Sequence, residues 1–243
     1  MRVLTWNMGF WQRRVEHDRA LQYLFAELQP DVALLQEVRR PLPDDARFVF
    51  VPAHSDWGTA VYLRSALDPH PFCLSVDVPA RPGRAAGASI RVPSGKEIAF
   101  VSVHVPIVLG RVIPSARCIF GGLSTDLSGR SFFVGGDLNT ARSAEGYWPG
   151  YGHDDFWQWL DASEFMECHQ LLKLEEQPTF MHPRMRQPIQ DDHLFVSHDL
   201  AAFVRSCGVI DDDALHGLSD HLPIIAEVDL SCGEARREPT KLG

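Results

Sequence analysis

Residues 31–37 read DVALLQE, a short apolar run that closes on a glutamine and a glutamate. A run of this length without alternation is typical of a β-strand buried on both faces, as strands are in α/β proteins. The preceding residues 16–28 (EHDRALQYLFAEL) space their apolar side chains along one face of a helix, and Pro30 ends that helix. We therefore expect a helix over 16–28 that leads into a buried strand over 31–36.

Outward from this point, strand patterns outnumber helical ones. Helical spacing recurs at residues 114–127 and at roughly 154–161, between predicted strands. This order favours one mixed α/β domain over residues 1–230, with two packed sheets and helices outside them, and a flexible tail at 231–243. The other predicted strands are residues 2–6, 48–51, 59–63, 72–76, 88–92, 98–104, 132–134, 193–196, 204–210 and 224–230.

Composition excludes several classes of protein. The 243 residues contain no apolar stretch near the ~18–20 residues that span a bilayer, and the N-terminus lacks the apolar core of a secretory signal. We expect a soluble, cytoplasmic monomer without a membrane partner. Five widely spaced cysteines, none in a CxxC pair, indicate buried free thiols rather than a disulfide framework or a zinc site. The net charge of −9 does not favour a polyanionic partner, unless a cation or a local basic patch reverses the field.

Polar side chains recur where the apolar strands begin or end. Strand ends are rigid places from which a side chain can be aimed into a cleft. This inventory shows no obvious serine or cysteine nucleophile paired with a base, but it has many of the oxygen ligands that hard cations such as Mg²⁺ prefer. It therefore favours metal-assisted attack of water on phosphorus. The residues are Asn7, Glu37, His104, Asp137, Asn139, Asp192, Asp220 and His221.

Six short motifs in this chain resemble, in their order, those of the endonuclease/exonuclease/phosphatase superfamily. The resemblance covers nearly the whole chain and implies an α/β (α+β) four-layer sandwich, in which two mostly antiparallel sheets pack together between helices. It also implies a site at the shared edge of the sheets. The motifs are TWN (5–7), LQE (35–37), SVH (102–104), GDLN (136–139), DHLFVS (192–197) and SDHLP (219–223), and GTAVYLRS (58–65) and PTF (178–180) resemble further family segments.

The resemblance also implies a metal site. Glu37 is expected as the principal ligand of Mg²⁺ or Mn²⁺, with Asn7 beside it to hold the metal or a metal-bound water. Asp220 is expected as a further ligand. Taken alone, a glutamate such as Glu37 is as often a surface residue, and an asparagine such as Asn7 commonly serves in a turn or cap.

The catalytic roles are likewise implied by the resemblance. Asp137 is expected to orient or deprotonate the attacking water, and Asn139 to place the phosphate. His221 is expected to contact the scissile phosphate, with Asp192 orienting its imidazole. His104 corresponds to a histidine that some family members use as an acid for the leaving oxygen. The ordinary alternatives are turn and cap residues, and a lone strand histidine is more often simply hydrogen-bonded.

One motif departs from the family pattern. The orienting aspartate is commonly followed by an aromatic residue, whereas here Asp192 is followed by His193 and preceded by a second acid, Asp191. The register of LFVS selects Asp192 as the partner of His221, with Asp191 as the alternative.

Three segments bear on the substrate. Phe10 and Trp11 follow Asn7 and are candidates to stack on a base or sugar, although a core role is equally plausible. Arginines recur in ARPGR (80–84), in HPRMR (182–186) and just after GDLN. We expect Arg142, Arg184 and Arg186 to bind substrate phosphate, against the alternative of a solvated basic loop.

The sequence leaves three functional hypotheses. The first is a Mg²⁺- or Mn²⁺-dependent phosphodiester hydrolase (endonuclease, exonuclease or phosphatase in type), with a phosphate ester and in particular DNA as substrate. The second is a phosphatase or phosphodiesterase acting on a small phosphorylated metabolite or lipid headgroup. The third is a catalytically silent protein that binds a partner through the same cleft, which the presence of every residue of the pattern disfavours.

Overall fold

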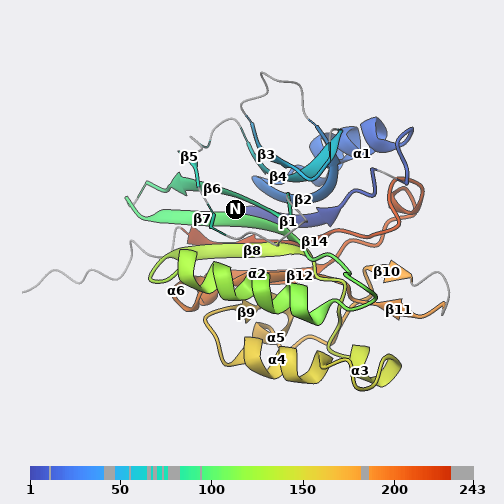
Figure 1. Ribbon diagram of the computed structural model, residues 1–243. Coiled ribbons are helices and arrows are strands. Elements are labelled where there is room, and N and C mark those ends of the chain that lie inside the picture. The colour runs from blue at the N-terminus through green and yellow to red at the C-terminus, as the bar shows by residue number, and fades with distance from the viewer. Residues whose placement is uncertain are drawn as a thin grey trace, which may run out of the picture.

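Two six-stranded sheets stack face to face, and helices cover their outer faces (Figure 1). This computed structural model describes residues 1–10, 12–40, 47–54, 56–64, 67, 70–72, 74–75, 83–93, 95–181 and 186–230. The four-layer α/β sandwich that the motifs imply is therefore confirmed. The tail predicted at 231–243 lies outside the described residues.

The first sheet has the strand order β13-β14-β1-β2-β4-β3. Its central pair, β1 and β2, is parallel, and every other pair is antiparallel. The parallel pair brings the ends of β1 and β2 to the same edge of the sheet. The strands are β1 (Arg2–Asn7), β2 (Val32–Arg39), β3 (Phe48–Pro52), β4 (Trp57–Leu63), β13 (Val204–Val209) and β14 (Ile224–Val228).

The second sheet repeats this plan with the order β5-β6-β7-β8-β12-β9. Its parallel pair is β7 and β8, and the other pairs are antiparallel. A separate two-stranded sheet, β10 and β11, projects at one end of the sandwich (Figure 1). The strands are β5 (His70–Pro71), β6 (Ala85–Arg91), β7 (Glu97–His104), β8 (Ser131–Asp137), β9 (Met166–Glu167), β10 (Phe180–Met181), β11 (Pro188–Ile189) and β12 (Asp192–Val196).

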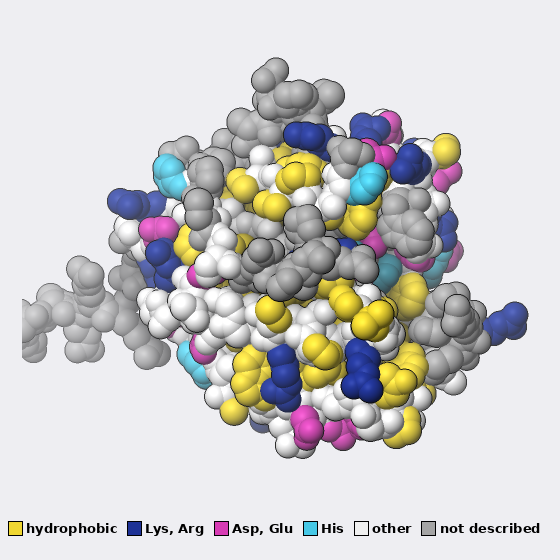
Figure 2. Space-filling view, in the orientation of Figure 1, with side chains coloured by type: hydrophobic (Ala, Val, Ile, Leu, Met, Phe, Trp, Pro, Cys, Tyr) yellow, Lys and Arg dark blue, Asp and Glu magenta, His cyan; other side chains and the backbone are white. Residues whose placement is uncertain are grey.

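The helices form the two outer layers, with α1 beside the first sheet and α2 and α4 beside the second (Figure 1). Basic side chains lie among hydrophobic ones on the face that α2 and α4 present (Figure 2). On this face the Arg117 guanidinium lies 5.4 Å from the ring centroid of Trp159. The helices are α1 (His17–Tyr23), η1 (Leu24–Leu28), α2 (Ile113–Asp126), α3 (Ala144–Tyr147), α4 (His153–Asp161), α5 (Cys168–Leu171), α6 (His198–Ala201) and η2 (Leu215–Gly217).

Each boundary between layers has its own apolar cluster. Successive side chains of a strand point to opposite faces and therefore join different clusters. On β1, Val3 joins the cluster between the sheets, where Phe100 and Phe133 stack with ring centroids 5.7 Å apart. The neighbouring Leu4 faces the other way and packs in the cluster that contains Leu24. Large side chains buried in this way stabilise the fold by about 1.5–3 kcal/mol each. Because both faces of the central strands are buried, their sequences read as continuous apolar runs.

The structure corrects several sequence expectations. The helix expected over 16–28 is an α-helix only to Tyr23, and a single π-helical stretch over Leu24–Leu28 completes it. No strand forms over 72–76 in its described part, and the short edge strand is His70–Pro71 instead. Of the described cysteines, Cys168 and Cys207 are buried as predicted, whereas Cys118 is exposed. No helix among the described residues is long and apolar enough to cross a bilayer.

Candidate active site

Three central strands end in polar residues at one edge of the sandwich. Asn7 is the last residue of β1, His104 of β7 and Asp137 of β8. Within the second sheet His104 is in register with Asp137, which in turn pairs with Asp192 at the start of β12. The sheet therefore holds these three side chains at the same level.

Glu37 reaches this edge through an irregularity in β2. The sequence suggested that the strand ends just before Glu37, but β2 continues to Arg39 with a register shift against β4 between Leu35 and Val38. Glu37 has a φ of 47°, in the left-handed region that non-glycine residues rarely occupy. Bulges of this kind turn a side chain out of the regular alternation and are common beside active sites. The local strain is therefore an argument for a functional role of Glu37.

The predicted residues converge on one cavity of about 310 Å³. Among the predicted catalytic and metal-binding residues, only Asp192 does not line it, because Asp192 lies fully buried behind His221. The cavity also has lining residues that the sequence did not single out, namely Gln12, Trp57, Arg84, Pro106, Ile107 and Phe180.

His221 and Asp192 form a buried pair. His221 Nδ1 lies 2.7 Å from Asp192 Oδ2, so Asp192, and not Asp191, orients the imidazole. Burial by itself lowers the pKa of His221, but the Asp192 carboxylate outweighs it, and the pKa stands well above its ordinary value. Phe180 stacks on the imidazole with ring centroids 4.6 Å apart. With Nδ1 engaged, Nε2 is the nitrogen that His221 can offer to a substrate.

Asp137 is held by two hydrogen bonds. Asn7 Nδ2 donates to Asp137 Oδ2 over 2.9 Å, and the backbone N–H of Asn139 donates to Oδ1 over 2.8 Å. Burial raises the pKa of Asp137 to about 6, His221 opposes the shift and Asp192 adds to it. Asn139 has a φ of 52° and its amide donates to the Val105 carbonyl over 3.0 Å. Asp137 is thus a fixed carboxyl poised between its two protonation states near neutral pH.

His104 is held by an arginine that sequence reasoning did not assign to it. Arg84 Nη1 lies 2.9 Å from His104 Nδ1. A guanidinium only donates, so Nδ1 accepts and the proton of the neutral ring sits on Nε2. Burial, with Arg84 and His221 adding to it, holds the pKa of His104 well below its ordinary value. The Nε2–H therefore faces Glu37 Oε1 and Asp137 Oδ2, each 3.7 Å away, as a neutral donor.

The donor set at this edge fits a magnesium ion. Mg²⁺ is usually held by one or two carboxylates, with water and substrate phosphate completing its shell. Besides Asp137, the carboxylates on the cavity wall are Glu37 and Asp220. No group of three acidic, histidine or cysteine side chains among the described residues forms a metal cage by itself. Gly9 makes room for Asp220, because a Cβ on Gly9 would lie 2.8 Å from Asp220 Oδ1. The Oδ1 atom of Asn7 accepts from the Gly9 N–H over 3.0 Å and keeps a second lone pair for a water or a metal.

The two predicted substrate arginines that the structure describes, Arg142 and Arg186, do not line the catalytic cavity. Arg142 turns away from the cavity: its Nε donates to Glu167 over 2.7 Å, and its Nη atoms donate to Asp161 over 2.7 and 2.9 Å. This pairing leaves Arg142 a structural part of the fold, contrary to its expected contact with phosphate. Arg186 is exposed with a φ of 50°, and Arg184 lies outside the described residues.

Of the aromatic pair after Asn7, the first member belongs to the described residues. Phe10 is 5% exposed and packs edge-on against His17 with ring centroids 4.9 Å apart, which makes it a core residue. Trp11 lies outside the described residues. Stacking of a base on Phe10 is therefore excluded in this conformation.

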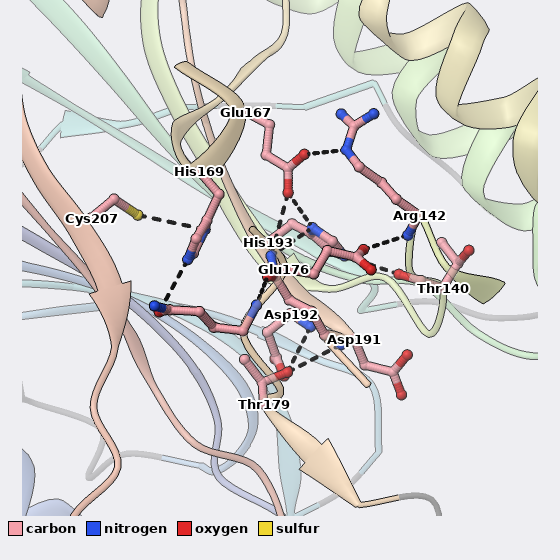
Figure 3. A network of polar contacts seen from close by, with 12 residues as sticks. Thr140, Arg142, Glu167, His169, Glu176, Thr179, Asp191, Asp192, His193 and Cys207 are labelled. Atoms are coloured by element: carbon pink, nitrogen blue, oxygen red, sulfur yellow. Dashed lines mark hydrogen bonds and ion pairs between the residues drawn. The ribbon is translucent and has the colours of Figure 1, made fainter. Parts of the chain in front are cut away.

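A buried polar network lies behind the site and was not predicted (Figure 3). Glu167 accepts from Arg142 and, over 2.7 Å, from His193 Nδ1, while His193 Nε2 lies 2.9 Å from the Thr140 carbonyl. Burial alone lowers the pKa of His193, but Glu167 reverses the shift and raises it. With an acceptor at each ring nitrogen, His193 is an imidazolium, and this charged pair replaces the aromatic residue usual after the orienting aspartate.

Comparison with known proteins agrees with this architecture. A sequence profile of the Endonuclease/Exonuclease/phosphatase family matches residues 4–221. The chain belongs to this family and is a hydrolytic phosphoesterase of the nuclease and phosphatase type. No curated protein sequence matches the chain.

Solved structures with the same fold include a 3′ phosphatase and two AP endonucleases. The 3′ phosphatase NExo from Neisseria, bound to a product DNA hairpin, is 21% identical over 94% of this chain and 99% of its own, with a TM-score of 0.71. An AP endonuclease from Archaeoglobus fulgidus is 16% identical over 95% and 100% of the two chains, with a TM-score of 0.70. The AP endonuclease LMAP from Leishmania major is 19% identical over 93% and 86%, with a TM-score of 0.69. At these identities the similarity establishes the fold.

Proposed function

We propose that this protein is a Mg²⁺- or Mn²⁺-dependent phosphodiesterase that hydrolyses DNA through attack of water on phosphorus. The observation that carries the proposal is the convergence of three carboxylates and two histidines on one cavity, with a buried aspartate behind one of the histidines. When bound, the metal supplies a Lewis acid that neutralises charge on the phosphoryl oxygens. Glu37 and Asp220 hold it, and Asn7 supports its shell.

The chain's own residues divide the remaining work. The carboxyl of Asp137, held by Asn7 and by the Asn139 backbone, takes a proton from the attacking water. The cationic His221, kept charged by Asp192, donates from Nε2 to a phosphoryl oxygen as negative charge builds there. The bond from phosphorus to the leaving oxygen breaks as the bond to water forms, and His104, with its proton on Nε2, is the neutral donor on the same wall that protonates the leaving oxygen. Each role needs only the protonation state that the structure already favours.

DNA is the proposed substrate for two reasons. The solved structures of the same fold include a phosphatase with a DNA hairpin product and two AP endonucleases. The site also needs to bind only one phosphate at a time. A divalent cation and Arg84 would face that phosphate, so the net charge of −9 does not oppose the binding of DNA. A cytoplasmic, monomeric enzyme is part of the same proposal.

The test is hydrolysis by the purified protein with Mg²⁺ or Mn²⁺ and with EDTA. The panel contains supercoiled DNA, single-stranded DNA, an abasic-site duplex, a 3′-phosphorylated duplex, bis-p-nitrophenyl phosphate and phosphorylated metabolites. We expect metal-dependent cleavage of a DNA substrate. Cleavage of the small esters alone would transfer the assignment to a metabolite hydrolase, and silence across the panel would favour a binding protein.

A matched pair of variants tests the metal site. Glu37→Gln removes the carboxylate charge with little change of shape, and we expect it to lower kcat/KM by ~10²-fold or more, since the metal contributes several kcal/mol to the transition state. Glu175→Gln makes the same change at an exposed position away from the cavity and should leave turnover unchanged. Full activity of Glu37→Gln, or of the wild type in excess EDTA, would remove the metal from the mechanism.

A further inference from the structure

A second cavity of about 490 Å³ adjoins the catalytic one. The two share Ile107, Asn139 and Phe180 as lining residues, so a ligand can occupy both at once. A cavity of this size is within the range of small-molecule sites, about 300–1,000 Å³. A group attached to the phosphate in the first cavity would therefore extend into the second.

The walls of the second cavity are largely apolar and include three aromatic rings. Trp148 and Tyr151 come from the segment that joins α3 to α4, and Phe180 comes from β10. Tyr151 is 51% exposed, which is unusual for a tyrosine that serves only in packing. Flat, partly exposed rings beside a phosphate site are the platforms on which proteins stack unpaired nucleobases, at about 1–3 kcal/mol per base.

Asp191 is the one acidic residue among those that line the second cavity, beside the polar Asn139 and His153. It is 5% exposed, and its backbone is engaged on both sides, by Thr179 Oγ1 at 3.1 Å and by the Leu138 N–H at 2.8 Å. Its carboxyl receives no hydrogen bond from the described residues and lines the cavity. In Figure 3 the Asp191 carboxyl points away from the network of polar contacts that includes Glu167 and His193. A ligand in the cavity can therefore donate a hydrogen bond to this carboxyl.

The charge of the group agrees with this geometry. Burial, with the Asp137 carboxylate adding to it, raises the pKa of Asp191 to about 8. Both forms of the carboxyl keep an oxygen that accepts a hydrogen bond, and the ionised form repels a second phosphate. The cavity therefore suits the uncharged, hydrogen-bond-donating part of a nucleotide and not its phosphate.

We propose that the second cavity binds the nucleobase attached to the scissile phosphate, and that Asp191 selects a base with an exocyclic amino group by accepting its N–H. This inference deepens the proposed function and rests on it for the phosphate in the first cavity. Trp148 and Tyr151 supply the stacking surface, which is indifferent to base identity. Asp191 adds the preference for adenine, guanine or cytosine over a base without an amino group, which makes it a specificity-determining residue.

The test measures binding without turnover. Adenosine 5′-monophosphate, purine riboside 5′-monophosphate, which lacks only the amino group, and ribose 5-phosphate are titrated calorimetrically into the full chain in EDTA. We expect adenosine monophosphate to bind about tenfold more tightly than the purine analogue, the scale of one hydrogen bond. Both should bind more tightly than ribose 5-phosphate, because of stacking.

Variants then assign the preference to Asp191. Asp191→Leu should abolish the difference between the two purine nucleotides while keeping their advantage over ribose 5-phosphate. Asp191→Asn retains an acceptor oxygen and should keep most of the difference. Asp213→Asn, an equal change of charge at an exposed position, is the control and should match the wild type.

Several results would overturn the inference. Equal binding of the two purine nucleotides by the wild type does so without any variant, and so does a difference that survives in a folded Asp191→Leu. Tighter binding of phosphocholine than of adenosine monophosphate would reassign the cavity to an ammonium headgroup. DNA cleavage without an amino preference would refute this inference alone, whereas an amino preference without cleavage of any DNA would refute the proposed function alone.

Discussion

Replacing Glu167 by glutamine should destabilise the protein without touching the catalytic cavity. Glu167 is 4% exposed and accepts from two cationic side chains, His193 and Arg142, each over 2.7 Å. Burial by itself raises the pKa of Glu167, but these two partners outweigh it and lower the pKa from 4.5 to about 2. Glutamine keeps the shape of the side chain and removes the charge that both partners need.

The size of the effect follows from that pKa. A difference of roughly 2.5 between the unfolded and folded values corresponds to about 3 kcal/mol of stability at neutral pH, at 1.36 kcal/mol per unit. This is also near the lower end of the 3–5 kcal/mol seen when one partner of a buried pair is removed. Because the folded pKa is lowered, the stabilisation is present above pH 4.5 and is lost as the pH falls toward 2.

The assay is urea unfolding of the wild type and Glu167→Gln at pH 7 and pH 3. At pH 7 we expect a difference of about 3 kcal/mol, or roughly 6–12 °C in Tm. Less than half of that difference should remain at pH 3. Glu175→Gln serves as the control and should match the wild type at both pH values. A difference below about 1 kcal/mol at pH 7, or one that does not shrink at pH 3, would refute the reasoning.

Three further predictions concern histidines. His221→Ala should keep the fold and the metal affinity while lowering the rate by ~10²–10⁴-fold, and a near-wild-type rate would exclude His221 from the chemistry. Arg84→Met removes the donor to His104 Nδ1 and one cause of its lowered pKa, so an NMR titration of the His104 imidazole should show a higher pKa in the variant; an unchanged pKa would contradict the role given to Arg84. Burial, and then Arg39, lowers the pKa of His17 to about 4, so stability should fall by about 3 kcal/mol as the pH drops from 6.5 to 4. In urea unfolding His17→Gln should flatten this fall, and a slope unchanged in the variant would assign it to other groups.

The residues of the candidate site could be predicted from the sequence because most of them lie at strand ends. Asn7, His104 and Asp137 each close an apolar run, and a run that stops at a polar residue is visible without any structure. The order of the motifs supplied the rest, including the choice of Asp192 over Asp191. The structure gives the physical reason for this choice. Successive side chains of a strand point to opposite faces, so Asp191 and Asp192 cannot both face His221.

What the sequence could not show is where long side chains turn. Arg142 follows the GDLN motif closely, yet its guanidinium runs to Asp161 and Glu167, which are far along the chain. Arg84 stood out only as one of two arginines in a loop, and its contact with His104 depends on the pairing of β6 with β7. These contacts depend on how distant segments pack together, and local sequence patterns do not predict that packing.

The π-helical stretch and the bulge at Glu37 were missed for a related reason. Residues 24–28 keep the apolar spacing of an α-helix. The wider turn of the π-helix therefore could not be predicted from that spacing. Glu37 likewise ends an apolar run whose continuation to Arg39 becomes evident only from its pairing with β4. Irregularities that aim a functional group are thus the features that periodicity predicts least well.

The order in which the site residues occur along the chain has a consequence for synthesis on the ribosome. The first of them, Asn7, emerges at the start and the last, His221, only near the end, with the others in between. A chain released early therefore lacks the His221 imidazole, and with it the group proposed to face the phosphate. On the proposed mechanism, an unfinished copy would be an ineffective nuclease, so the cell would meet the activity only in molecules whose translation has passed residue 221.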